Sequence, residues 1–368
     1  MKVLVTGSNG FIGKNLISRL QEENNIEIVT FDIEDTFEKI KNNIKDIDFI
    51  FHLAGINRPQ TKDEFYSGNS DLTKKIVDLI KGKKIPLLIT SSIQAELNND
   101  YGKSKKIAEE YIKNNLNNYY IYRLHNVFGK WCRPNYNSVV ATFCNNIAHD
   151  ETIQIDDPKK ELTLIYIDDV VEEFINILYG NTPKETHKNG CHYIKPRYNV
   201  TLKYLSDKIS EFRTSMNSIF VPKTGDDFIR KLYSTYISYL DLNNMIIPIE
   251  KHTDDRGSFA EILKTFDSGQ FSISYSKPGI VRGNHYHHTK IERFIVVKGK
   301  ARISFKNIIS DEKISFEVSD EKIEIVTIPV GYTHKIENIG KEEMILAIWC
   351  NELFNEKRPD TFFREVKE

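Results

Sequence analysis

Near its start the chain reads Val3-Leu4-Val5-Thr6-Gly7-Ser8-Asn9-Gly10-Phe11-Ile12-Gly13. The aliphatic residues before the glycines predict a short strand, and the apolar period over residues 16–20 predicts a helix directly after them. Gly7 permits a tight turn, Gly10 lets the backbone approach a pyrophosphate, and Gly13 lets helix and strand pack closely. Such a turn can exist without a ligand, but its position after the first strand of a βαβ unit favours a dinucleotide. The residues expected to bind this cofactor are Gly7, Asn9, Gly10, Phe11, Ile12 and Gly13.

Asp32 directly follows the second predicted strand, residues 26–31. Its carboxylate can accept hydrogen bonds from both ribose hydroxyls, which favours NAD. Lys14, beside the glycine loop, favours the opposite choice because its ammonium can meet the 2′-phosphate of NADP. The sequence leaves NAD(H) and NADP(H) open.

The pattern of predicted strands and helices differs between the two halves of the chain. Up to about residue 245, short β-branched runs alternate with helix-period segments such as 14–23 and 72–81, which predicts βαβ units. From about residue 246, strand-like runs at 271–274, 293–297, 301–305 and 323–328 follow closely, with hardly a helical period among them. We therefore expect an α/β Rossmann-like doubly wound parallel sheet over residues 1–245 and an all-β antiparallel barrel or jelly roll over residues 246–368.

The amino-acid composition limits the kinds of molecule that the protein is expected to bind. The chain has 368 residues, enough for two domains, and 51 Lys and Arg balance 52 Asp and Glu for a net charge of -1. This balance gives no long-range attraction for nucleic acid or an anionic membrane. The four cysteines are scattered, and no run reaches the roughly 18 apolar residues of a membrane helix. We expect a soluble, cytoplasmic protein that binds a small molecule.

Tyr101 and Lys105 open a predicted helix, where a spacing of four residues puts both side chains on one face. A nearby ammonium favours the phenolate and so eases proton donation to a carbonyl oxygen as hydride arrives at its carbon. Ser92, with Ser91 as the alternate, ends the preceding predicted strand and can hydrogen-bond the same oxygen. Tyr-x-x-x-Lys is common on helix surfaces, but after a dinucleotide loop it predicts a catalytic group of Ser92, Tyr101 and Lys105.

At this point the first 245 residues resemble the extended short-chain dehydrogenase/reductase family, whose nucleotide-sugar members share the glycine loop and the Tyr-x-x-x-Lys pair. His52-Leu53-Ala54-Gly55 is similar to the family's strand along the cofactor. The resemblance therefore adds Leu53 and Ala54 to the cofactor site, together with Tyr101 and Lys105 of the catalytic group. Arg123-Leu124-His125-Asn126 is similar to its Arg-x-x-Asn segment, which implies that Asn126 lies near the sugar nucleotide. Leu162 departs from the family, because many members have an arginine there to contact the diphosphate.

A second set of residues predicts a metal site. Gly279, His285, His287, Glu292 and Gly299 have the spacing Gly-x5-His-x-His-x4-Glu-x6-Gly, and Pro329-Val330-Gly331-Tyr332-Thr333-His334 follows with Asn338. Histidines at i and i+2 point to one face of a strand, and a carboxylate after the next turn can join them. Both segments resemble the motifs of cupins. We expect His285, His287, Glu292 and His334 to bind a metal, and among Zn, Fe, Ni and Mn we favour Zn²⁺ because this half shows no other redox device.

Two further segments resemble the dTDP-4-dehydrorhamnose epimerases, which exchange protons beside a ketone on a nucleotide-linked sugar. They are residues 254–261, with Asp-x-Arg-Gly-x-Phe-x-Glu from Asp254 through Arg256 to Glu261, and Arg282-Gly283-Asn284-His285. The resemblance makes Arg256 and Glu261 candidates for holding substrate, with a surface salt bridge as the alternative. The family's base does not carry over, because here His285 is expected to be a metal ligand.

Together the two halves resemble, over essentially the full length, bifunctional enzymes of capsular polysaccharide assembly. The resemblance implies that the cupin epimerises C3 of a UDP-linked 4-keto amino sugar and that the reductase then reduces C4 with NADPH, towards UDP-N-acetyl-L-fucosamine. It also implies a homodimer. One alternative is a reductase whose cupin only supports assembly; another is a regulatory module that senses a nucleotide sugar, against which the retained Ser92, Tyr101 and Lys105 argue.

Overall fold

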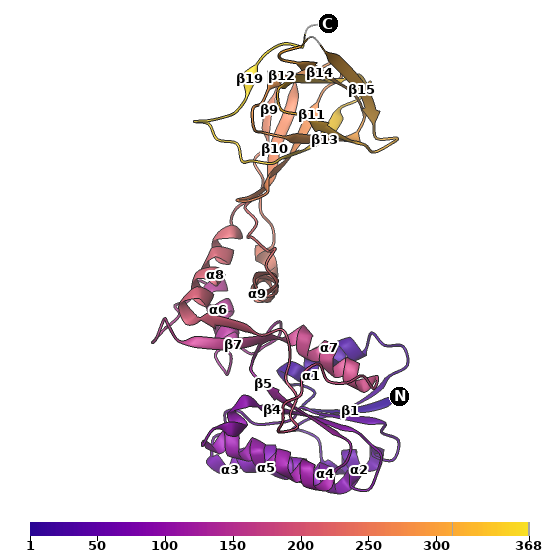
Figure 1. Ribbon diagram of the computed structural model, residues 1–368, viewed down its shortest axis with the longest axis vertical. Helices are drawn as coiled ribbons and strands as arrows, with labels where there is room; N and C mark the ends of the chain where they lie inside the picture. The colour runs from indigo at the N-terminus through magenta and orange to yellow at the C-terminus, as the bar shows by residue number, and fades with distance from the viewer. Residues whose placement is uncertain (311, 367–368) are drawn as a thin grey trace. The chain divides into compact units, whose positions relative to one another are not determined.

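The computed structural model describes residues 1–310 and 312–366 and divides them into two compact units (Figure 1). The first unit comprises residues 1–210 and 227–240, and the second comprises residues 211–226 and those from 241 onward. The chain therefore enters the second unit twice. Within residues 211–226, the backbone of Phe220 pairs with that of Lys264 in the second unit. The sequence predicts one boundary, between residues 245 and 246, and does not predict this earlier segment.

The first unit is built on a parallel five-stranded sheet in the order β2-β1-β3-β4-β5. This confirms the predicted Rossmann-like sheet. The strand predicted before the glycine loop is β1, and the strand predicted at residues 26–31 is β2, which begins one residue later. The strands are β1 (Lys2–Thr6), β2 (Glu27–Phe31), β3 (Phe49–His52), β4 (Leu87–Ser92) and β5 (Tyr119–Leu124).

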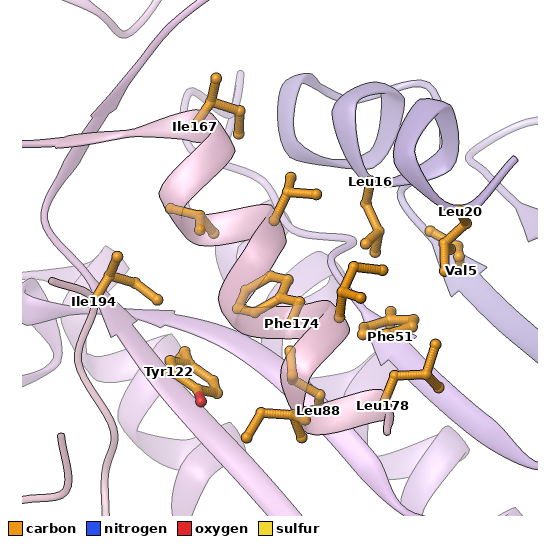
Figure 2. Close-up of a cluster of buried hydrophobic side chains, with 14 of the residues drawn as sticks. Val5, Leu16, Leu20, Phe51, Leu88, Tyr122, Ile167, Phe174, Leu178 and Ile194 are labelled. Carbon is orange, nitrogen blue, oxygen red and sulfur yellow. The ribbon is translucent and has the colours of Figure 1, made fainter. Parts of the chain in front are cut away.

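Helices cover both faces of this sheet because its strands alternate apolar side chains between the two faces. Val3 and Val5 face α1 and α7, whereas Leu4 faces α2, α4 and α5. Figure 2 shows the first of these clusters, with Leu16 and Leu20 of α1 near Phe174 of α7. The helices are α1 (Phe11–Leu20), α2 (Phe37–Asn43), α4 (Leu72–Ile80), α5 (Asp100–Asn115) and α7 (Ile167–Leu178).

A smaller three-stranded sheet, in the order β6-β7-β8, extends the first unit beyond β5. Lys231 ties this region together through ion pairs of 2.9 Å with Asp169 and with Asp227. The elements are β6 (Asn126–Phe128), α6 (Val139–Ala148), β7 (Glu161–Tyr166), β8 (Tyr198–Thr201), α8 (Leu202–Ser215) and α9 (Asp227–Ile237). Within the described residues, none of the helices combines the length and apolar character needed to cross a membrane.

The second unit packs two antiparallel sheets face to face, in the orders β16-β13-β18-β11-β10-β9 and β15-β14-β17-β12-β19. Apolar side chains from both sheets form its core, which confirms the predicted all-β fold. The strands are β9 (His252–Asp254), β10 (Gly257–Thr265), β11 (Gly269–Ser276), β12 (Val281–Tyr286), β13 (Glu292–Lys298), β14 (Lys300–Asn307), β15 (Lys313–Ser319), β16 (Ile325–Ile328), β17 (Tyr332–Asn338), β18 (Met344–Cys350) and β19 (Phe362–Phe363).

A buried ion pair joins α5 to β5. The Arg123 guanidinium donates to both carboxylate oxygens of Glu109, at 2.9 and 2.7 Å, and both side chains are almost fully buried. We expect Glu109→Ala to lower the unfolding free energy of the first unit by about 3 kcal/mol, because the buried guanidinium then keeps Glu96 as a carboxylate partner but loses the buried one. Urea unfolding followed by Trp131 fluorescence in a Trp349→Phe background measures this. The exposed neighbour Glu110→Ala is the control, and equal midpoints for the two variants would refute the prediction.

Candidate functional site

The glycine loop between β1 and α1 forms one wall of a pocket of about 510 Å³ at the carboxyl ends of the parallel strands. Gly7 has a φ of +68°, and a Cβ on it would lie 2.7 Å from the backbone nitrogen of Ala54. A Cβ on Gly13 would lie 2.2 Å from the Gly7 carbonyl oxygen, so its nearest contact is the loop itself rather than a strand. No side chain caps α1, which leaves its first N–H groups free for an anion.

All the predicted loop residues line this pocket, as does Leu53, while Ala54 supports the turn from behind. Asp32 lies beside a second, adjoining hollow of about 1040 Å³. Its Oδ2 accepts the Asn9 N–H at 2.6 Å and its Oδ1 accepts the Ile33 N–H at 2.8 Å. Lys14 and Arg133 line the same hollow, so cations as well as a carboxylate lie where a ribose would sit.

The predicted catalytic residues Ser92, Tyr101 and Lys105 meet in the first pocket. Asn99 caps α5 by accepting the Gly102 N–H, which fixes Tyr101 in the first turn. The Lys105 ammonium lies 6.0 Å from the centroid of the Tyr101 ring and donates to the Thr90 carbonyl at 3.1 Å. The helix thus presents the phenol and the ammonium together, as its spacing predicts.

The pKa of Tyr101 is shifted in the direction opposite to the one expected. Burial raises the pKa of Tyr101 to about 12, and the hydrogen bond with Ser92 only partly opposes this rise. Burial also lowers the pKa of Lys105 to about 8, against the attraction of Glu109. Tyr101 is therefore a neutral phenol at pH 7, the form that carries a proton to give.

The two serines at the end of β4 have different surroundings. Ser91 donates to Glu109 at 2.5 Å and so belongs to the buried group around Arg123. Ser92 accepts the Gln94 N–H at 3.2 Å and hydrogen-bonds Tyr101. This contrast favours Ser92 over its alternate as the partner of a substrate carbonyl.

The substrate side of the pocket contains one predicted residue and two that sequence reasoning missed, and a third missed residue, Arg58, lies next to one of these. Asn126 lines it, with its amide donating to the Thr163 carbonyl at 3.2 Å. Arg133 and Tyr136 also line it, and the guanidinium carbons of Arg133 and Arg58 lie 5.2 and 5.8 Å from the centroid of the Tyr136 ring. Two positively charged guanidinium groups beside the same ring attract an anion. Arg58 and Arg133 are far apart in the sequence, so only the fold brings them together.

In the second unit, the four predicted metal ligands converge. One ligand atom from each of His285, His287, Glu292 and His334 lies within 4.8 Å of the others. His285 and His334 face each other on β12 and β17, and Glu292 begins β13. Burial, helped by repulsion from His334, lowers the pKa of His285 to about 4, so this imidazole is neutral at pH 7.

These residues fit a bound cation. The Nδ1 of His287 lies 2.5 Å from the Asp360 carbonyl, which can only accept, so Nδ1 carries a proton; in the neutral imidazole, the form that binds metals, the lone pair is then on Nε2. That buried Nε2 has no hydrogen-bond partner and lies 3.5 Å from a Glu292 oxygen. A lone pair that faces a carboxylate is unfavourable unless a cation lies between them.

Arg256 and Glu261 lie outside this ligand cluster. Arg256 is exposed and pairs with Asp254 at 2.5 Å, which is the surface salt bridge named as its alternative. Glu261 pairs with Lys264 at 2.7 Å and accepts from the Gln270 amide at 3.1 Å. His288 is exposed and packs against Phe362, away from the ligands.

Comparisons with known proteins match the N-terminal and C-terminal parts of the chain to two different families. Residues 3–189 match the NAD dependent epimerase/dehydratase family, and residues 252–362 match the polysaccharide biosynthesis C-terminal domain. The chain is 45% identical, over the full length of both chains, to UDP-2-acetamido-2,6-beta-L-arabino-hexul-4-ose reductase of Pseudomonas aeruginosa.

Solved structures extend the likeness. The capsular polysaccharide assembling protein CapF from Staphylococcus aureus covers the whole chain and is itself wholly covered, with a TM-score of 0.90 and 44% identity. This confirms the resemblance to proteins of capsular polysaccharide assembly. UDP-glucuronic acid 4-epimerase from Bacillus cereus, with NAD bound, shares the fold of the first unit at 17% identity and a TM-score of 0.54, over 65% of this chain and 98% of that one. The chain belongs to the NAD dependent epimerase/dehydratase family.

Proposed function

We propose that the chain is a bifunctional nucleotide-sugar enzyme. Its C-terminal domain, residues 246–368, epimerises C3 of a UDP-2-acetamido-2,6-dideoxy-4-keto-hexose. Its N-terminal domain, residues 1–245, then reduces the C4 ketone to UDP-N-acetyl-6-deoxy-L-talosamine, towards UDP-N-acetyl-L-fucosamine for capsule polysaccharide. The observation that carries the proposal is the meeting of Ser92, Tyr101 and Lys105 with the glycine loop in one pocket, in a chain 45% identical throughout to a UDP-sugar reductase.

In the reduction, a bound NADPH supplies hydride to carbon 4. The Tyr101 hydroxyl gives its proton to the carbonyl oxygen, and Ser92 hydrogen-bonds the same oxygen. The raised pKa of Tyr101 keeps the phenol protonated until negative charge develops on that oxygen. Lys105 positions the ribose and stabilises the phenolate that remains.

The choice of NADPH rests on charge beside the glycine loop. The Asp32 carboxylate already accepts two backbone N–H groups, whereas Lys14 and Arg133 line the hollow next to it. The 2′-phosphate of NADPH would be attracted by these cations, whereas the uncharged ribose of NADH would be attracted less.

For the epimerisation, a proton leaves carbon 3 and returns on the opposite face. A Zn²⁺ ion held by His285, His287, Glu292 and His334 would supply positive charge for the negative charge that develops on the ketone oxygen. The four ligand side chains are then bonded to the ion, so the base is another group. Arg256 and Glu261 as substrate contacts, the homodimer and the cytoplasmic location stay predictions.

The diphosphate of the substrate is the anion that Arg58 and Arg133 would bind beside Tyr136. They supply the positive charge that Leu162 does not, because Leu162 occupies the position where many family members have an arginine. This places the diphosphate at one end of the pocket and leaves the sugar to reach Tyr101 and Asn126.

Tyr101→Phe removes the proton donor while leaving the ring in place. We expect the rate of NADPH oxidation with the epimerised 4-keto sugar to fall by about 10²- to 10⁴-fold, with NADPH affinity unchanged. Tyr111→Phe is the matched control, because it removes a hydroxyl on the same helix that bonds Asp78 outside the pocket. A Tyr101→Phe rate near that of the wild type would exclude this role.

Arg58→Gln and Arg133→Gln each remove one charge beside Tyr136. Since a hydrogen bond to a charged group contributes about 1.5–3 kcal/mol, each change should weaken UDP binding by roughly 10- to 100-fold. Calorimetric titration with UDP and, separately, with NADP⁺ distinguishes the two ligands, and the exposed Lys75→Gln controls for net charge. Arg133→Gln can weaken both ligands, so Arg58→Gln decides the matter: unchanged UDP affinity in this variant would contradict the assignment.

A further inference from the structure

The loop between β12 and β13 carries the predicted metal ligand His287 and ends at the next ligand, Glu292. A residue far away in the sequence, Asp360, accepts hydrogen bonds from the backbone of this loop. The Asp360 carboxylate accepts the N–H groups of His288, Thr289 and Lys290 at 3.0, 2.8 and 2.8 Å. It also accepts the Thr289 hydroxyl at 3.0 Å. One side chain thus satisfies three consecutive backbone donors of the loop that joins His287 to Glu292.

The backbone of Asp360 contacts the ligand itself. Its carbonyl oxygen accepts the Nδ1–H of His287 at 2.5 Å, which directs the bare Nε2 of that ring toward Glu292. Asp360 has a φ of +43°, in the left-handed region that residues other than glycine seldom adopt. This conformation accompanies a geometry in which the carboxylate and the carbonyl of one residue face the same loop.

The residues on both sides of Asp360 bind the same loop and two strands that bear ligands. The Lys290 ammonium donates to the Pro359 carbonyl and to the Thr361 hydroxyl, both at 3.0 Å. Phe363 pairs with His285 in β12, and the Arg364 carbonyl accepts the hydroxyl of Thr333, the neighbour of His334 in β17. The segment 359–364 therefore contacts the strand or loop of each of the three histidines.

We propose that Asp360 is a positioning residue of the metal centre: its carboxylate fixes the loop that carries His287, and its carbonyl sets the tautomer and direction of that imidazole. The inference rests on the proposed function only in that the four ligands bind a metal. It assigns to the C-terminal segment a part in metal binding that the motif spacing does not contain. The chain of contacts runs from Asp360 through His287, without a contact between Asp360 and the ion.

The test is the metal affinity of the full-length protein, measured by competition with a chromogenic chelator for Zn²⁺. Asp360→Ala removes the carboxylate and disfavours the left-handed backbone, and we expect a loss of about 10- to 100-fold in affinity. Asp360→Asn keeps a side-chain oxygen and a residue type that tolerates this backbone, so it should lie between the wild type and Asp360→Ala. Asp320→Asn is the control, because Asp320 caps the Gly299 N–H in a loop that bears no ligand.

A second readout separates positioning from general stability. With Co²⁺ in place of Zn²⁺, the visible absorption of both Asp360 variants should differ from that of the wild type and the control, since a reoriented His287 changes the coordination geometry. NADP⁺ affinity, which reports the other unit, should stay unchanged. Wild-type Zn²⁺ affinity and an unaltered Co²⁺ spectrum in Asp360→Asn and Asp360→Ala would overturn the inference. A wild-type protein that binds no metal would instead refute the metal centre itself.

Discussion

The turn at Gly7 is the constraint on which the first site depends. A backbone φ of +68° and the contact with Ala54 bring β1 to an abrupt end and point the uncapped start of α1 into the pocket. Because the strands are parallel, their carboxyl ends meet at the same edge of the sheet, and Ser92 at the end of β4 arrives beside the same pocket. A side chain at position 7 or 13 would collide with backbone, so the loop keeps this form only with glycine.

The two units use burial in different ways. Around Tyr101 and Lys105, burial shifts both pKa values toward the uncharged forms, which holds a proton ready on the phenol. Around His285, burial likewise keeps the imidazole neutral, but there the result is a lone pair available to a metal. Each unit contains its own site, formed by its own residues, as expected for two successive reactions on one substrate.

Much of the fold and of both sites could be predicted because the decisive residues are close in sequence. The glycine loop, the Tyr101 and Lys105 pair and the β12 to β13 ligands each lie within one short segment, where helical or strand periodicity fixes their relation. The direction of the Tyr101 pKa shift could not be predicted in this way, because burial depends on elements from the whole unit. Arg58 with Arg133, and Asp360 with His287, are pairs that only folding brings together, so no spacing in the sequence reveals them.

We propose that one chain performs proton exchange in one domain and hydride transfer in the other. Incubating the protein with the UDP-4-keto sugar in D₂O, with and without NADPH and with and without a chelator, tests it most directly by mass and by cofactor absorbance. We expect deuterium at carbon 3 before NADPH is added and NADPH oxidation afterwards. A chelator should abolish the deuterium uptake, whereas NADPH oxidation with the already epimerised sugar should persist. Oxidation of NADPH with no deuterium at carbon 3 would contradict it, and the chain would then be a reductase whose β-domain has another role.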